Sequence, residues 1–322
     1  MFLINKFKIA FVLIFMAAAL SCNKNGKFLS IKINKIMVTD AVPSGSGLAF
    51  YKNELFIVGD DAEFVAKFSL NNFTYTRSNL FVNAHHQRIE KTVKPDLEAA
   101  IIGGINDEVF LFAFGSGGVS PYRDTLFAMN MQRPDKNFKR SLLPLYNSIK
   151  KTAGLKETEL NIEGASKAGN KLLLFNRGNN LVIIISWKGF TAYLKNEKAV
   201  PDLKVLKIPL PVINNFPIGI SGACAINEQE ILFTASLEET TDYINDGIIK
   251  GSYIGLLQIK NDTELYVVAL TSLNDAAGKP IADKLESIEI IKRQGRNVEA
   301  VAVADNDDGK SKLFFLTLKL PE

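Results

Sequence analysis

The sequence of 322 residues has few of the residues that form disulfides or soft-metal sites, with two cysteines and two histidines. Cys22 lies in a leader-like segment, so Cys224 has no partner for a disulfide in the mature chain, and the core must hold by packing. The net charge is only +4, and removing Lys6 and Lys8 with the leader lowers it by two. Such a bias is too small to indicate binding to nucleic acid or to an anionic membrane surface.

Long amphipathic helices are also missing. The apolar stretch at residues 9–20 follows a positively charged front and is too short to span a bilayer comfortably. The ending Ala-Ala-Leu-Ser-Cys resembles a bacterial lipobox, which implies a signal peptide over residues 1–21, an acylated Cys22 and a tether over residues 22–27. We therefore expect a lipid-anchored protein of the bacterial cell envelope; an ordinary cleaved secretory signal is the alternative.

The most informative stretch predicts a β-hairpin in the middle of the chain. A strand that opens with Glu163 is followed by a turn at residues 169–170 and by the apolar run Leu172–Phe175, which ends in the polar tip 176–179. In an antiparallel hairpin the start of the first strand and the end of the second lie at one edge. Glu163 and Arg177 are therefore expected to be neighbours.

The same unit recurs along the chain, with an oxygen-bearing side chain at its opening and an apolar second strand. The opening residues follow one another at roughly 50 to 65 positions and are Ser46, Glu98, Glu163, Ser221 and Glu286. Units of this size, each a small antiparallel sheet, are typical of β-propeller blades. The sequence predicts an all-β fold with one five-bladed propeller over residues 28–322. A β-sandwich and a six-bladed ring with one degenerate blade are the alternatives.

The two ends of the chain are expected to close this ring. The last repeat has room for three strands, and the alternating segment Leu29–Ile36 is placed to supply the fourth. Closure removes the free sheet edge that invites association, and we expect a monomer. One short helix is predicted within residues 135–154.

The first strand of each propeller blade lines the central channel, so the five opening residues are predicted to converge on the axis. Three carboxylates at close quarters must either share protons or bind a cation. Oxygen donors without His or Cys suit a hard ion, and calcium is the predicted cofactor. Alternatively, each Glu caps its own blade turn or pairs with a Lys.

The order Ser, Glu, Glu, Ser, Glu at blade spacing, with Ser46-Gly47-Leu48 followed by Asp60-Asp61, resembles the calcium-activated nucleotidase (apyrase) propellers. The resemblance implies a five-bladed fold, a central calcium and hydrolysis of nucleoside diphosphates. The chain has a single Arg177 where those enzymes have paired arginines. The segments 94–98 and 175–179 are also similar to an uncharacterised family of bacterial envelope propellers, which implies the fold and no activity.

The blade tips are expected to surround the mouth of the channel. They carry Asp60, Asp61, Arg177, Glu238, Asp242, Asp246, Asp305 and Asp307. Arg177 is the predicted anion clamp, because its planar fork binds phosphate or carboxylate in a bidentate way, and a salt bridge to a nearby acid is the alternative. Asp61 or Glu238 could act as a general base on a metal-bound water, or could simply orient loops. The predicted substrate contacts are Asp60, Asn176, Asn179 and Asp305.

Two functions follow from this pattern. One is a calcium-dependent hydrolase of a small anionic, phosphorylated substrate, with Asp61, Arg177 and Glu238 as catalytic residues. The other is a non-catalytic ligand-binding or scaffold propeller in which calcium is structural. His85 and His86 are interpreted as surface residues, because adjacent strand residues point to opposite faces.

Overall fold

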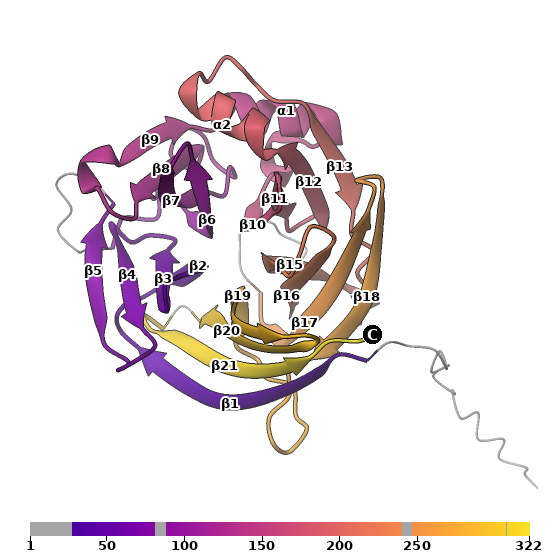
Figure 1. Ribbon diagram of the computed structural model, residues 1–322. Helices are drawn as coiled ribbons and strands as arrows, with labels where there is room; N and C mark the ends of the chain where they lie inside the picture. Colours follow the sequence, from indigo (N-terminus) through magenta and orange to yellow (C-terminus); the bar gives the residue numbers. More distant parts are fainter. Residues whose placement is uncertain (1–27, 81–87, 240–246, 307) are drawn as a thin grey trace, which may run out of the picture.

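A computed structural model describes residues 28–80, 88–239, 247–306 and 308–322. The chain forms five antiparallel sheets arranged as a five-bladed β-propeller around a central axis (Figure 1). This confirms the predicted fold and blade number. The innermost strand of each blade neighbours the innermost strands of the two adjacent blades.

The blades follow one another in chain order. Blade one consists of β2 (Gly45–Tyr51), β3 (Glu54–Gly59), β4 (Phe64–Ser69) and β5 (Tyr75–Asn79). Blade two consists of β6 (Leu97–Ile105), β7 (Glu108–Gly115), β8 (Thr125–Asn130) and β9 (Phe138–Ser141). Blade three consists of β10 (Ile162–Ala168), β11 (Lys171–Asn176), β12 (Leu181–Ser186) and β13 (Leu203–Lys207).

The last two blades are larger or composite. Blade four consists of β14 (Val212–Ile213), β15 (Phe216–Ala225), β16 (Glu230–Glu238), β17 (Ile249–Lys260) and β18 (Glu264–Ser272). Blade five consists of β19 (Lys284–Gln294), β20 (Asn297–Asp305), β21 (Ser311–Lys319) and the N-terminal strand β1 (Ser30–Thr39).

The ring is closed by β1, as the sequence predicts. β1 runs antiparallel to β21 along the outside of blade five, with pairs from Ser30↔Lys319 to Thr39↔Ser311 (Figure 1). The Ser311 hydroxyl donates to the Val42 carbonyl at 2.7 Å and accepts from the Gly45 amide at 2.9 Å. Strands from both ends of the chain therefore complete one sheet and tie it to blade one.

Apolar clusters between neighbouring blades form the core. In β11, Leu172 and Leu174 pack toward blade two, whereas Leu173 and Phe175 pack toward blade four. Each blade is thus covered on both faces, which explains why its second strand is a continuous apolar run rather than an alternating one. Clusters of this kind lie at the five junctions between blades.

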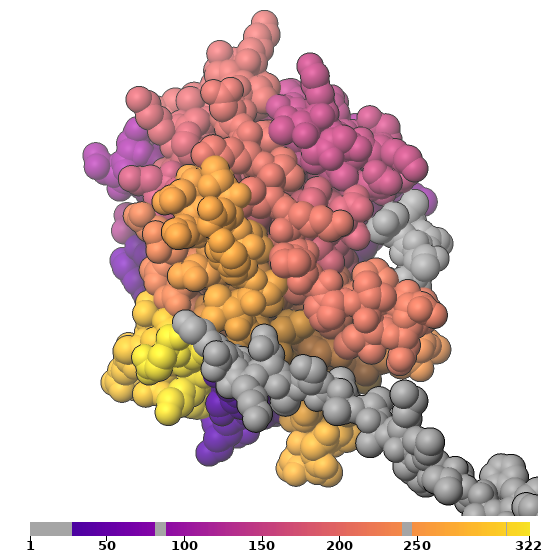
Figure 2. All heavy atoms as spheres, turned by 90° about the vertical axis from the view of Figure 1, so that its right-hand side faces the viewer, coloured from indigo at the N-terminus to yellow at the C-terminus, as the bar shows by residue number. Residues whose placement is uncertain are grey.

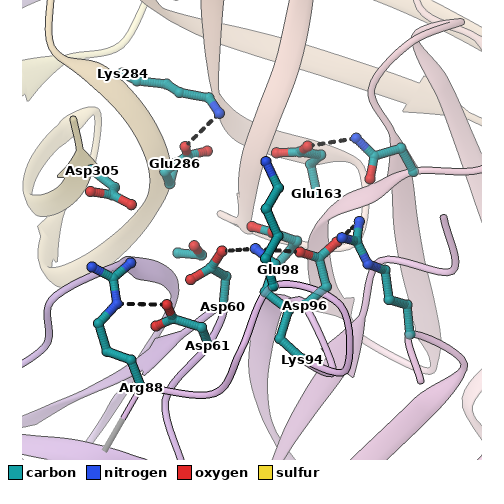
Figure 3. Close-up of a pocket in the computed structure, with 14 residues that line it drawn as sticks. Asp60, Asp61, Arg88, Lys94, Asp96, Glu98, Glu163, Lys284, Glu286 and Asp305 are labelled. Carbon is teal, nitrogen blue, oxygen red and sulfur yellow. Dashed lines mark hydrogen bonds and ion pairs between the residues drawn. The ribbon is translucent and has the colours of Figure 1, made fainter. Parts of the chain in front are cut away.

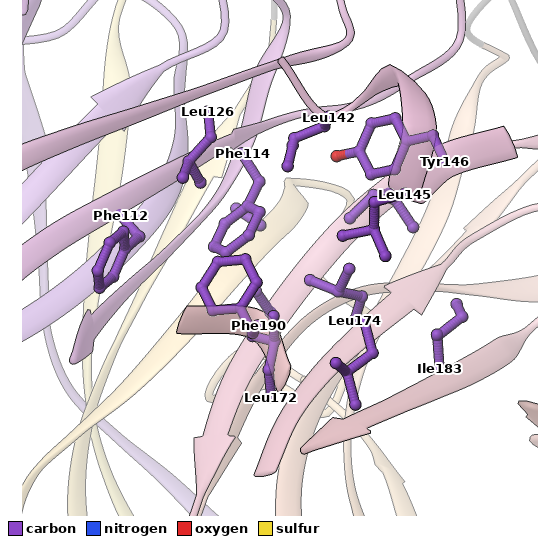
Figure 4. Packing of buried hydrophobic residues seen from close by; sticks show 14 of the residues in the cluster. Phe112, Phe114, Leu126, Leu142, Leu145, Tyr146, Leu172, Leu174, Ile183 and Phe190 are labelled. Atoms are coloured by element: carbon purple, nitrogen blue, oxygen red, sulfur yellow. The ribbon is translucent and has the colours of Figure 1, made fainter. Parts of the chain in front are cut away.

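Two helices pack into the apolar cluster at the junction between blades two and three (Figure 4). α1 (Leu143–Ala153) lies within the predicted helical segment, and its Tyr146 is fully buried. α2 (Trp187–Lys195) was not predicted from sequence. It starts where the Ser186 hydroxyl accepts the Gly189 amide, and it buries Phe190, Tyr193 and Leu194.

The outer strands of the blades form the sides of the molecule. In the side view, β18 and its neighbours occupy much of the surface (Figure 2). Among the described residues, neither helix has the length and apolar character needed to cross a bilayer.

Candidate functional site: a charged cavity in the propeller channel

Each innermost strand carries a β-bulge at the predicted repeat position. In β2, for example, the pairing steps from Gly45↔Gly59 to Gly47↔Val58, so one residue is left out of the ladder. A bulge bends the strand and redirects the side chain at that point. The five residues left out in this way are Ser46, Glu98, Glu163, Ser221 and Glu286. These positions are therefore structurally equivalent around the ring.

The residue after each bulge is small because adjacent innermost strands approach closely there. A Cβ on Gly47 would lie 3.0 Å from the Ala100 amide nitrogen, and one on Gly222 would lie 2.6 Å from the Ser287 Cα. The five residues at this position are Gly47, Ala99, Gly164, Gly222 and Ser287. The small residue after each bulge thus follows from the packing around the channel.

Four of the five bulge residues border a cavity of about 200 Å³. Its lining is almost entirely charged (Figure 3). The acids are Asp60, Asp61, Asp96, Glu98, Glu163, Glu286 and Asp305. The bases are Arg88, Lys91, Lys94, Arg123 and Lys284, and Ser46 and Asn161 complete the lining. This volume is below that of most small-molecule sites, so the cavity suits an ion with waters or a small anion.

The cavity brings together seven of the twelve residues that the sequence assigns to metal, substrate and catalysis, namely Ser46, Asp60, Asp61, Glu98, Glu163, Glu286 and Asp305. Ser221, Asn176, Asn179, Arg177 and Glu238 are not part of its lining. Ser221 occupies the equivalent bulge, but its hydroxyl donates to the Leu285 carbonyl at 2.5 Å.

Three carboxylates form the densest acidic cluster. Oxygens of Asp60, Asp96 and Glu98 lie within 4.8 Å of one another. Burial, followed by repulsion from Asp96, Glu163, Asp60 and Glu286, raises the pKa of Glu98 well above its ordinary value. Burial likewise raises the pKa of Asp60, against the effect of Lys94. The arrangement therefore stores electrostatic repulsion that a bound cation would relieve.

Lys94 lies against this cluster. Its ammonium forms ion pairs with Asp60 and, at 2.8 Å, with Asp96. Although burial opposes it, the negative charge of Asp96 and Asp60 raises the pKa of Lys94, so the ammonium stays charged. Asp96 also accepts from the Ser116 hydroxyl at 2.5 Å and pairs with Arg123 at 2.7 Å.

Glu286 faces the cavity from blade five. Its Oε1 lies 3.2 Å from the Lys284 ammonium, whereas its Oε2 is buried and has no hydrogen-bond partner within the described chain. Burial raises the pKa of Glu286 to about 8, with Lys284 opposing the shift. Asp60 Oδ1 is a second buried oxygen in the described lining that accepts no hydrogen bond. Such atoms are costly unless a cation or water satisfies them.

Glu163 and Arg177 are neighbours, as the hairpin argument predicts. Arg177 Nη1 lies 3.3 Å from Glu163 Oε2, and Arg177 Nη2 lies 2.9 Å from Glu238 Oε1. Glu163 Oε1 also accepts from the Asn161 side chain at 2.7 Å. Lys284 approaches Glu238 at 3.6 Å. Arg177 therefore adopts the salt-bridged alternative, joining blades three and four behind the cavity.

Asp61 belongs to the tip that follows β3. Its two oxygens accept from the Ser44 hydroxyl at 2.6 Å and from Arg88 Nε at 2.7 Å. Because both oxygens are engaged, this carboxylate orients the loop that carries Arg88. Asp305 is the last residue of β20 and lines the cavity from blade five.

The two asparagines predicted as substrate contacts lie beside this site. Asn176 is fully buried; its side chain accepts from the Asn161 amide at 2.6 Å and donates to the Glu159 carbonyl at 3.0 Å. It therefore fixes the loop that precedes Glu163. Asn179 is part of the turn between β11 and β12.

Sequence reasoning missed most of the basic residues of the cavity. Lys94 and Asp96 stand just before Glu98, and the pattern Lys-Pro-Asp-Leu-Glu was the signal that could have found them. Arg88 and Lys91 belong to an irregular segment without periodicity, so nothing local predicted their direction. Several predicted positions, Cys22, His85, His86, Asp242, Asp246 and Asp307, lie outside the described residues.

The fold and the site together define a closed five-bladed β-propeller with a charged, predominantly acidic cavity in its channel. Within this class, the chain belongs to DUF6929, a family of unknown function, which matches residues 41–318. A comparison with curated proteins finds no match.

Solved structures show likeness at the level of general architecture. A glutaminyl cyclase from Myxococcus xanthus has 12% identity and a TM-score of 0.45, with 91% of this chain and 97% of that chain covered. The PQQ-bound aldose sugar dehydrogenase from Streptomyces coelicolor has 10% identity and a TM-score of 0.42, with 91% and 99% covered. A streptogramin B lyase has 9% identity and a TM-score of 0.39, with 89% and 98% covered. Likeness at this level says nothing about chemistry.

Proposed function

We propose that this propeller binds a divalent cation in its channel cavity, with calcium as the first candidate. The observation that carries the proposal is the cluster of Asp60, Asp96 and Glu98, whose oxygens lie within 4.8 Å of one another. The unpartnered Oε2 of Glu286 faces the same cavity. Oxygen ligands alone, in a space that also admits waters, suit calcium better than a transition metal.

The role that the geometry supports best is ligand binding. Arg88, Lys91 and Arg123 line the cavity together with the acids, so a small oxyanion could contact the cation and these bases at once. Arg88 has a side chain that is 51% exposed and therefore accessible from the mouth. This basic wall compensates for the missing second arginine beside Arg177.

Hydrolysis of a phosphorylated substrate is the second candidate function. It is favoured by the buried oxygens Asp60 Oδ1 and Glu286 Oε2, which have no hydrogen-bond donor in the described chain and, when ionised beside a bound cation, could accept a proton from an attacking water. The predicted general bases fit less well, because Asp61 uses both oxygens and Glu238 lies against Arg177. Assignment of Asp61, Arg177 and Glu238 to catalysis stays a prediction.

The setting of the protein is part of the proposal. The leader over residues 1–21 and the lipobox-like ending support a lipid on Cys22, with residues 22–27 as the tether and a location in the bacterial cell envelope. A closed ring and a small net charge support a monomer without nucleic-acid partners.

Calcium titration tests the cation site. At a calcium concentration about 100 times its Kd, binding should stabilise the folded state by about 2.7 kcal/mol and raise the melting temperature. Glu98→Gln should weaken binding by about tenfold or more, because a ligand in the middle of the cluster is lost. Glu299→Gln, at an exposed ion pair on β20, is the matched control and should bind like the wild type.

The proposal fails if calorimetry detects no binding of calcium or another divalent ion and chelator leaves melting unchanged. Phosphate release from a panel of phosphoesters and phosphoanhydrides, with calcium or with chelator, separates the two functions. Release that needs calcium and is lost in Glu286→Gln supports hydrolysis. Binding without any release supports the ligand-binding role.

A further inference from the structure

The Lys94 ammonium lies where a cation bound to the acidic cluster would sit. It contacts Asp60 and Asp96, which come from blade one and from the segment entering blade two (Figure 3). Its side chain is only 13% exposed. A buried ammonium between two carboxylates of a three-acid cluster is a monovalent counter-ion attached to the chain.

This counter-ion does not neutralise the cluster. The three carboxylates of Asp60, Asp96 and Glu98 are accompanied by Lys94 and by Arg123, which pairs with Asp96 at 2.7 Å. When all three carboxylates are ionised, one negative charge is left over. A divalent ion in place of the ammonium would balance this charge. The ion could also bind carboxylate oxygens to which an ammonium, with its three donors, does not donate.

A second, independent observation points to a cation in this cavity. Glu286 is 4% exposed, and its Oε2 is a buried acceptor of the described lining without a hydrogen-bond donor. It comes from blade five, on the other side of the channel from β6. Lys94 cannot satisfy this oxygen while it pairs with Asp60 and Asp96, whereas a cation and its waters can bridge several carboxylates.

We propose that Lys94 is the resident counter-ion of the Asp60–Asp96–Glu98 cluster and that a divalent cation binds by displacing its ammonium. The proposal rests on the cation site proposed above and adds the residue that sets its affinity. The cation competes with a tethered positive charge, so the wild-type site binds weakly, in the range of extracellular calcium modules.

The displaced ammonium of Lys94 can move to another part of the cavity lining. Lysine carries its charge on a flexible four-carbon stem, and Lys94 belongs to the same segment as Arg88 and Lys91, which line the cavity. Moved toward these residues, the ammonium would add to the basic wall. Cation binding thus increases the positive charge available to an anionic ligand, and by linkage the anion should tighten cation binding in return.

Calorimetric titration of the full folded protein with calcium chloride or magnesium chloride tests the displacement. Lys94→Met removes the competing charge and should bind calcium about tenfold tighter or more. Lys171→Met is the matched control, because it removes the same charge from an ion pair with Asp262 that lies outside the cavity lining. It should change the affinity less than about twofold. Lys94→Arg keeps the charge and should not tighten binding.

Melting curves add a readout that does not depend on heats of binding. Without metal, Lys94→Met leaves buried carboxylates unpaired and should melt below the wild type; calcium should raise its melting temperature more than that of the wild type. Lys94→Gln, which can still donate to Asp60 and Asp96, serves if Lys94→Met does not fold, and the same tightening is expected.

The possible outcomes are distinct. If the wild type binds calcium and neither Lys94→Met nor Lys94→Gln binds it more tightly than Lys171→Met does, the displacement is wrong and the cation site stands. If neither the wild type nor the Lys94 variants bind calcium or magnesium, both proposals fall.

Discussion

Glu289 and Cys224 form a part-buried polar contact on the innermost strands, away from the charged cavity. The Cys224 thiol donates to Glu289 Oε2 at 3.1 Å, across the junction between β15 and β19. Burial raises the pKa of Glu289 to about 7, against the hydrogen bonds from Cys224 and Ile290. Burial also raises the pKa of Cys224 well above its ordinary value, so the thiol stays protonated and can donate.

This contact predicts a pH dependence of stability. Between the ordinary glutamate pKa and about 7, the folded state keeps a proton on Glu289 that the unfolded state has released. The free energy of unfolding should therefore fall as pH rises through this window. Glu289→Gln, which mimics the protonated form, should lose less melting temperature between pH 5 and pH 8 than the wild type.

Glu299→Gln on the exposed face of β20 is the control for that measurement and should follow the wild type. If the melting temperatures of Glu289→Gln and the wild type fall equally between pH 5 and pH 8, the carboxyl of Glu289 has the same pKa in the folded and the unfolded state.

At the scale of the single strand, the bulge followed by a small residue is the element that builds the channel. The bulge redirects Glu98, Glu163 or Glu286, and the small residue after it lets the next blade approach. At Gly222, the tightest of these positions, any side chain would press on the backbone of the next blade. The same packing brings the carboxylates within reach of one another.

Gly222→Ala should test this packing. The added Cβ would lie 2.6 Å from both the Glu286 carbonyl oxygen and the Ser287 Cα, which are backbone atoms. Overpacking of this kind costs about 1–3 kcal/mol of unfolding free energy. Gly104→Ala in β6 is the control, because its Cβ would meet only the Glu108 carbonyl at 3.7 Å. Denaturant unfolding should show a loss for Gly222→Ala and almost none for Gly104→Ala; equal effects would argue against a tight channel.

At the scale of the whole molecule, stability depends on the ring being closed by strands from both ends of the chain. β1 pairs with β21 along its length, and the Thr271 hydroxyl donates to the Leu29 carbonyl at 2.9 Å. Leu29 is fully buried in the cluster between blades four and five. Without β1, the edge of β21 would be free to pair with other molecules.

A chain that begins at Asp40 should therefore be less stable than one that begins at Phe28, and it should self-associate. Size-exclusion chromatography and thermal melting measure both effects. The chain from Phe28 keeps β1 and should remain monomeric. A monomeric chain from Asp40 with an unchanged melting temperature would mean that β1 contributes nothing to closure.

Much of the architecture could be predicted from sequence because its causes are local or periodic. The recurrence of Ser46, Glu98, Glu163, Ser221 and Glu286 fixed the number of blades and the positions that bulge. Apolar runs ending in polar tips predicted the second strands, since a blade buried on both faces needs such runs. α2 was not predicted because its Gly, Thr and aromatic residues have low helix propensity. Packing of its Phe190 against Phe112 and Phe114 stabilises the helix instead.

The sequence by itself determined the repeat, the ring and the five positions that bulge. Only the tertiary structure decided how the charges pair there. Lys94 enters the acidic cluster, Arg177 bridges Glu163 and Glu238, and the Ser221 hydroxyl turns to a backbone carbonyl of the next blade. Strand periodicity places a residue within its own blade, but ion pairs across the channel join residues from different blades, and their distances exist only once the ring has closed.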